Sequence, residues 1–217
     1  MTAERTWKAG MRSRIGLAVF ATAVVAFSTG CGASGEGKDQ GPIEFTAEPC
    51  WGLLEESDVA PVLAKGQRVK VDSTDLEKSV KDRRTSFCNG NQQNAGGAGF
   101  NAYVQWRSEN PYKNSDPVDA WEPLKDGTRP EGKDWGAGAE TWSWGTRVAV
   151  ECTAELPAGA PASYKARKFL DVRVSGKAAE GVGSSVSRQA FANMTLKLAR
   201  GVAEKVGCTN DLHLPQA

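Results

Sequence analysis

Residues that could do chemistry are few and widely spaced in this 217-residue chain. The only histidine, His213, lies in a polar C-terminal tail, which nearly excludes a serine–histidine or cysteine–histidine nucleophile. Two carboxylates about 5–10 Å apart across a cleft can hydrolyse glycosidic bonds. Asp116, Asp119, Glu122 and Asp126 are available for such a pair, although acidic residues are common in irregular segments. A cell-wall glycan hydrolase that uses these carboxylates is therefore the alternative prediction, and no catalytic residue is assigned.

Aromatic side chains are the more suggestive feature. They can hold sugar rings, quaternary cations or the aromatic side chain of a partner. Trp121, Trp135 and Tyr112 lie in the segment 108–140, which has no sustained helical or strand period, and they are the predicted ligand or partner contacts. An alternative is that Trp121 and Trp135 only pin this segment to the domain. The remaining tryptophans in the region are expected to fill the core of a sheet: Trp106, Trp142 and Trp144.

The first 31 residues have the pattern of an export signal. Four basic side chains precede an apolar run from Ile15 to Phe27, and three small residues then lead to Cys31. The run is shorter than the roughly 20 residues that span a bilayer, and small residues before a scissile bond suit a signal peptidase. FSTGC resembles the bacterial lipoprotein box, although Ser28 replaces its usual aliphatic residue. We predict a signal peptide over residues 1–30 and lipid attachment at Cys31, the alternative being ordinary cleavage that leaves a free thiol.

Four further cysteines predict two disulfides, because an even number in an exported domain is typical of a disulfide framework. They are Cys50, Cys88, Cys152 and Cys208. Four cysteines allow three pairings, of which we favour Cys50 with Cys88 and Cys152 with Cys208. No two of them are close enough in sequence for the paired ligands of a structural zinc site, so no metal is predicted. No cofactor motif is present either.

Composition suggests one domain behind a tether. Residues 31–44 begin with the lipidated cysteine and are rich in glycine and polar residues, so they are expected to be flexible. Residues 45–217 are expected to form a single extracytoplasmic domain. After removal of the leader the chain has slightly more acidic than basic side chains, which argues against nucleic acid as a partner.

Hydrophobic periodicity predicts the elements that must position these residues. A short helix is expected after Ser57 as N-cap and before Gly66, and a long amphipathic helix from Ser187 to Val206. Alternating residues predict strands, and an Asn- and Gly-rich stretch predicts a loop. The strands are expected at 68–71, 100–107, 141–153 and 169–176, and the loop at 89–97. In the strand 141–153, Trp142, Trp144, Val148 and Val150 are expected to share the core face.

These elements together predict an α+β fold. It would contain an antiparallel sheet with a long C-terminal amphipathic helix packed on one face, a short N-terminal helix and two disulfides. The segment 108–140 would form a long irregular loop beside the other face.

The order of these features resembles a group of proteins. PC-x-x-LL from Pro49, a Ser-capped SDVAPVLAKG helix, a second cysteine before a tryptophan-bearing strand, and a closing strand and helix are similar to small secreted actinobacterial lipoproteins of unknown function. The resemblance covers Pro49 to about Cys208. The resemblance is weaker at the second cysteine. In those proteins a tryptophan lies very near this cysteine, whereas here a Gly/Asn stretch separates Cys88 from Trp106. The resemblance implies a lipid-anchored extracytoplasmic domain and transfers no catalytic residue.

The favoured prediction is therefore a non-catalytic binding or accessory lipoprotein. It would be held on the extracytoplasmic face of the cell membrane through the lipid on Cys31. An envelope protein or a cell-wall component would be its partner.

Overall fold

The computed structural model describes residues 41–82, 84–92, 96–112, 135–155, 162–165 and 167–215, all within the compact unit Lys38–Ala217. The predicted signal peptide, Cys31, Trp121 and the four carboxylates from Asp116 to Asp126 lie outside the described residues. The proposals that rest on them stay predictions.

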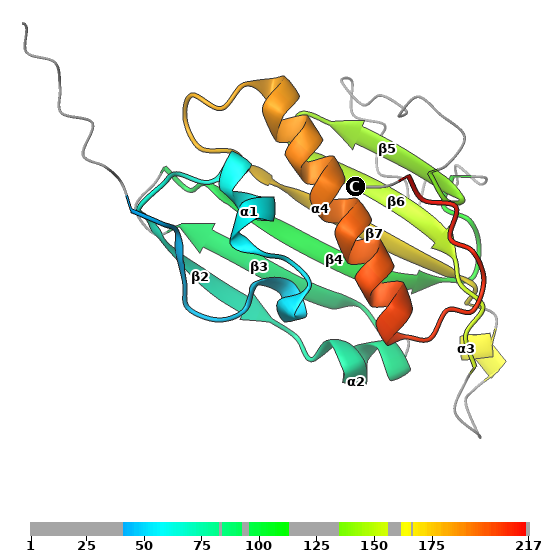
Figure 1. Cartoon of the computed structure of the whole chain (residues 1–217). Helices are drawn as coiled ribbons and strands as arrows, with labels where there is room; N and C mark the ends of the chain where they lie inside the picture. Colours follow the sequence, from blue (N-terminus) through cyan, green and yellow to red (C-terminus); the bar gives the residue numbers. More distant parts are fainter. Residues whose placement is uncertain are drawn as a thin grey trace, which may run out of the picture. The chain divides into compact units, whose positions relative to one another are not determined.

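Within the described residues, seven strands form one mostly antiparallel sheet (Figure 1). The strands are β1 (Glu44–Phe45), β2 (Arg68–Ser73), β3 (Ser86–Gln92), β4 (Gly99–Arg107), β5 (Gly138–Trp142), β6 (Gly145–Glu151) and β7 (Phe169–Lys177). Their order across the sheet is β1-β2-β3-β4-β7-β6-β5. β1 runs parallel to β2, and every other neighbouring pair is antiparallel.

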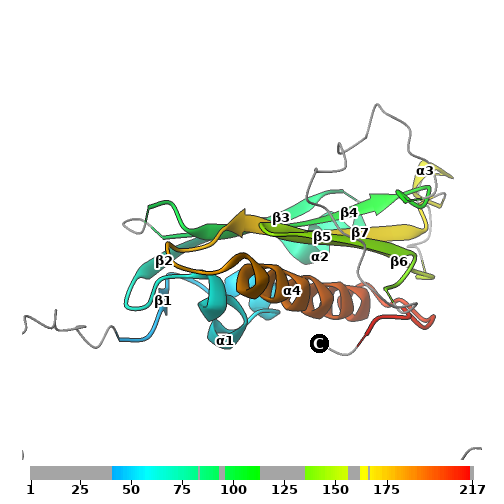
Figure 2. The same ribbon diagram turned by 90° about the horizontal axis from the view of Figure 1, so that it is seen from above.

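The helices are α1 (Glu56–Val59), α2 (Leu76–Lys81), α3 (Ala162–Lys165) and α4 (Ser184–Lys205), with 3-10 turns at Pro49–Gly52 and Ala60–Val62. Figure 2 shows α1 and the long α4 on the same side of the sheet. This arrangement confirms the predicted α+β fold with a C-terminal helix on one sheet face.

The core lies between α4 and the sheet. Phe191, Met194, Leu198 and Val202 of α4 are fully buried, at the helical spacing the sequence shows. They belong to one hydrophobic cluster with strand residues that include Val148, Val150, Val172 and Val174. The helix begins three residues before the predicted start, and Gly207, with φ of +73°, follows its end.

The predicted N-cap of α1 is wrong by two residues. Glu55 is the N-cap, and its backbone N–H donates to Asp58 Oδ2 at 2.7 Å. Lys197 of α4 donates to the same Asp58 oxygen at 2.7 Å and lies 3.4 Å from a Glu55 carboxylate oxygen. Glu55 and Asp58 form a reciprocal capping box, which explains why Glu55 and not Ser57 is the cap, and Lys197 pairs with both of their carboxylates.

The predicted single strand 141–153 is instead a hairpin. Trp142 pairs with Gly145, and Ser143 and Trp144 form the turn between β5 and β6. Because a hairpin changes the alternation of faces, Trp142 lies on the face opposite α4, whereas Val148 and Val150 lie in the core as predicted. A Cβ added to Gly145 would lie 3.0 Å from Trp142 Nε1, so a glycine at this position leaves space for the indole.

The predicted loop 89–97 is also wrong in its first part, because Asn89–Gln92 belong to β3. Gly90 lies opposite Phe100, and a Cβ on Gly90 would come within 2.4 Å of that ring. Gln92 is buried, and its side chain donates to and accepts from the Ala64 backbone at 2.7 and 3.0 Å. Polar and small residues are thus paired inside a central strand, where their composition had suggested a turn.

The irregular segment predicted at 108–140 ends before residue 138, earlier than expected. Gly138–Glu140 form the first part of β5, paired with Arg147–Ala149 of β6. The part of this segment between residues 113 and 134 lies outside the described residues.

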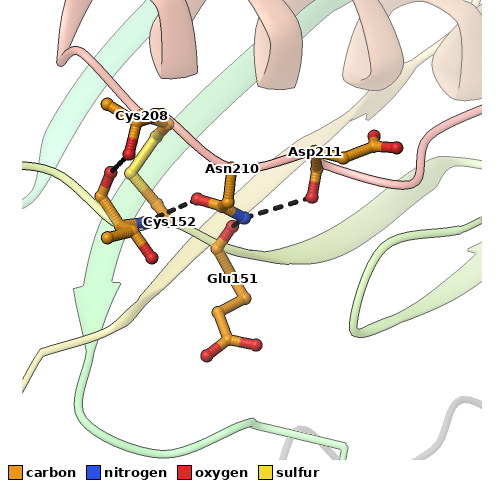
Figure 3. The surroundings of a disulfide bond; sticks show 7 residues. Glu151, Cys152, Cys208, Asn210 and Asp211 are labelled. Carbon is orange, nitrogen blue, oxygen red and sulfur yellow. Dashed lines mark hydrogen bonds between the residues drawn. A yellow bond between two sulfur atoms is a disulfide. The ribbon is translucent and has the colours of Figure 1, made fainter.

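Both disulfides have the pairing favoured from the sequence. Cys50–Cys88 joins the first 3-10 turn to β3, and Cys152–Cys208 joins the end of β6 to the residue after the α4 C-terminal turn. Figure 3 shows Asn210 beside the second bridge, where its side chain accepts from Thr153 N and donates to the Glu151 carbonyl. Two such disulfides indicate an oxidising, extracytoplasmic compartment. Across the described ranges, no helix combines the length and apolar composition needed to cross a bilayer.

Candidate functional site

The sheet face opposite α4 contains a groove of about 420 Å³, which we call the arginine groove. Its lining residues come from β4, β6, β7 and the residue before β3. They are Thr85, Asn101, Tyr103, Gln105, Arg107, Arg147, Asp171, Arg173 and Ser175. Three cations, one anion and several neutral hydrogen-bonding groups make this a polar surface suited to an anionic, hydroxyl-bearing ligand.

Strand pairing builds the groove. Tyr103, Arg173 and Arg147 lie directly opposite one another on β4, β7 and β6. Phe87 continues this row on β3, and Phe87 and Tyr103 are 39% and 40% exposed. The row therefore changes across the sheet from two accessible aromatic rings to two guanidinium groups.

A charged triad forms the floor of the groove. Arg147 Nε and Nη2 donate to the two Asp171 oxygens at 2.6 and 2.5 Å, and Arg107 Nε donates to Asp171 Oδ2 at 3.0 Å. Arg147 and Asp171 are both buried. Burial lowers the pKa of Arg147, but the hydrogen bonds and charge of Asp171 raise it by more, so its net shift is upward.

Arg173 has a different environment. Its guanidinium carbon lies 5.8 and 5.5 Å from the ring centroids of Trp142 and Trp144, which contact each other edge to face at 5.1 Å. Burial first, and then the charge of Arg147, lower the pKa of Arg173 to about 10. Because this pKa lies below its value in an unfolded chain, the charge on Arg173 opposes folding at every pH below about 10. A perturbed cation that lines a groove is a candidate functional group.

Tyr112 supports the triad from outside the groove lining. Its ring lies 5.6 Å from the Arg147 guanidinium carbon, and its hydroxyl donates to the Arg147 carbonyl at 3.1 Å. Asn110 holds the tyrosine, because its side chain accepts from Tyr112 N and donates to the Ala137 carbonyl. A Cβ on Gly138 would lie 2.6 Å from the tyrosine ring, so glycine permits this packing.

The two predicted contact residues that the structure describes, Tyr112 and Trp135, lie in different surroundings. Tyr112 lies against Arg147, whereas Trp135 packs against the hydrophobic core and does not line the groove. Trp121 lies outside the described residues. His213 is exposed in the C-terminal tail, where its backbone carbonyl accepts from Gly136 N.

The sequence reasoning missed the arginines and the aspartate of the groove. The signal available was the polar side of two alternating runs, which places Arg147 in one strand and Asp171 and Arg173 in another. Opposite charges on one face of two neighbouring strands indicate a cross-strand pair. Among the described residues no group of three or more His, Cys, Asp or Glu side chains could hold a metal ion.

Comparisons with known proteins found no match: no family model, no curated protein and no solved structure matches the chain. The functional argument therefore depends on the site itself.

Proposed function

We propose that this protein is a lipid-anchored extracytoplasmic binding domain, non-catalytic, that uses the arginine groove to hold a component of the cell envelope. The observation that carries the proposal is the groove itself. Its polar and aromatic lining lies on the sheet face away from α4, supported by an ion-pair triad in which Arg147 and Asp171 are buried and Arg107 is half-buried.

Its lining suits binding better than catalysis. Asp171, the one carboxylate that the described part of the chain contributes to the groove, accepts hydrogen bonds from two arginines, so both of its oxygens are engaged. A carboxylate held in this way positions guanidinium groups. The leader, the FSTGC box and the glycine-rich tether support membrane attachment through Cys31.

Attachment is tested by labelling cells with an alkyne fatty acid. The full-length protein should carry the label and fractionate with the membrane, whereas Cys31→Ala should lose the label and be released, because no acyl chain would hold it. Equal membrane recovery of both forms, with no label on either, would refute the anchor.

Binding is tested by capture from native envelopes with the tagged full-length protein. A Tyr103→Ala/Arg173→Gln double variant should lose the retained material, because it removes one ring and one cation from the groove. Arg200→Gln, on α4 at the other side of the sheet, should retain it. Identical capture by all three proteins, or capture lost only on deletion of residues 113–134, would refute binding through the groove.

A further inference from the structure

The arginine groove adjoins a second hollow. This hollow has a volume of about 430 Å³, and Thr85, Gln105 and Arg107 line both hollows. The second hollow adds Arg84 and Arg167 to the lining. Among the described residues, the two hollows are thus lined by five guanidinium groups and by one carboxylate, that of Asp171.

This concentration of positive charge is local. The whole chain has 27 basic and 26 acidic side chains, so its formal charges are nearly balanced. A lining with an excess of one sign of charge raises the local concentration of ligands of the opposite sign. All five cations are arginines, whose planar guanidinium group can bind a carboxylate or phosphate with two hydrogen bonds.

Neutral groups lie among the cations. Thr85, Asn101 and Gln105 offer hydroxyl and amide groups, which suit the hydroxyls of a sugar. The ring of Tyr103, 40% exposed, offers a flat surface at the opposite side of the arginine groove from Arg147. An apolar ligand would leave these polar groups without partners.

We propose that the two hollows together bind one acidic oligosaccharide, a stretch of sugar polymer in which successive units carry a carboxylate or phosphate group. This inference rests on the proposed function and names its ligand class. Arg173 would bind an acidic group in the first hollow, next to Arg147, which Asp171 already engages. Arg107 would lie at the junction, and Arg84 and Arg167 would bind a further acidic unit in the second.

The test uses calorimetry with the full-length protein in detergent. The probes are tetragalacturonate, a maltotetraose phosphorylated on each unit, galacturonate monomer and neutral maltotetraose. At least one acidic tetramer should bind at least tenfold more tightly than the monomer, and binding should weaken as salt is raised. The two acidic probes distinguish carboxylate from phosphate, and the neutral tetramer should not bind.

Variants at the two ends of the lining test whether one ligand spans both hollows. Arg173→Gln and Arg84→Gln should each weaken binding of the acidic tetramer at least fivefold, whereas only Arg173→Gln should weaken binding of the monomer. Arg200→Gln is the matched control and should leave both affinities unchanged. Melting temperatures close to that of the unmodified protein will show that each variant is folded.

Three results would overturn the inference: equal affinities for monomer and tetramer, no effect of Arg84→Gln on the tetramer, or no binding of either acidic tetramer. If envelope capture still depends on Tyr103 and Arg173 while the acidic probes fail, the ligand class is wrong and the proposed function stands. If envelope capture also does not depend on Tyr103 and Arg173, both the ligand class and the proposed function are wrong.

Discussion

Replacing Asp171 with asparagine is expected to lower the free energy of unfolding by about 3–5 kcal/mol, because the change leaves buried Arg147 without its counter-charge. The two side chains have nearly the same shape, so packing is preserved and the loss is electrostatic. In the folded protein, Asp171 accepts hydrogen bonds from Arg147 and Arg107, and its side chain is 7% exposed. Urea unfolding followed by circular dichroism would measure the change.

Asp72→Asn is the matched control for this experiment. Asp72 lies 3.1 Å from Lys70, and both side chains are 57% exposed. An exposed ion pair of this kind contributes about 0–1 kcal/mol, so this variant should unfold almost like the unmodified protein. A loss of less than about 1 kcal/mol for Asp171→Asn would show that the triad does not stabilise the sheet.

Removing the second disulfide, by changing Cys152 and Cys208 to serine, is expected to cost about 4 kcal/mol. The bridge closes a loop between residues 56 positions apart, and the chain-entropy model predicts a cost of this size for such a loop. The same bridge holds the segment after α4 against β6, where Thr209 N donates to the Thr153 carbonyl. Serine is nearly isosteric with a reduced cysteine, so most of the effect reports the missing bond.

Chemical unfolding and limited proteolysis together would check this second result. The variant should have a lower unfolding midpoint, and the chain after residue 205 should be cleaved first, because the tail would lose its covalent attachment. Reduced wild-type protein, in which Cys50–Cys88 is also open, gives the comparison. An unfolding free energy within about 1 kcal/mol of the intact protein, with an uncleaved tail, would contradict the prediction.

The regular elements were predictable where local periodicity and core burial agree. α4 has apolar residues at helical spacing that meet the sheet, and Phe100–Arg107 alternates as half-buried strands do. β3 was missed because its Asn and Gly residues are typical of turns. Only pairing on both sides, with the Phe100 ring over Gly90, explains how such residues form a central strand.

The hairpin β5–β6 shows why the face of a residue can be mispredicted. A continuous alternation of apolar residues across 141–153 hides a turn at Ser143–Trp144, and one turn is enough to place Trp142 on the opposite face. Gly145, which leaves space for the indole, was the local signal, although a glycine alone does not distinguish a turn from a strand.

The sequence by itself determined the fold class, the helix that covers the sheet and the expectation of two disulfides, with one of three pairings favoured. It also predicts an export leader and lipid attachment at Cys31. These features follow from local patterns and from cysteine number. Only the tertiary structure placed Arg107, Arg147 and Asp171 in one triad, because they lie on three different strands and meet only through strand register. Register depends on long-range pairing, which is why the alternating patterns indicate the polar faces of these strands but do not indicate which of their residues meet.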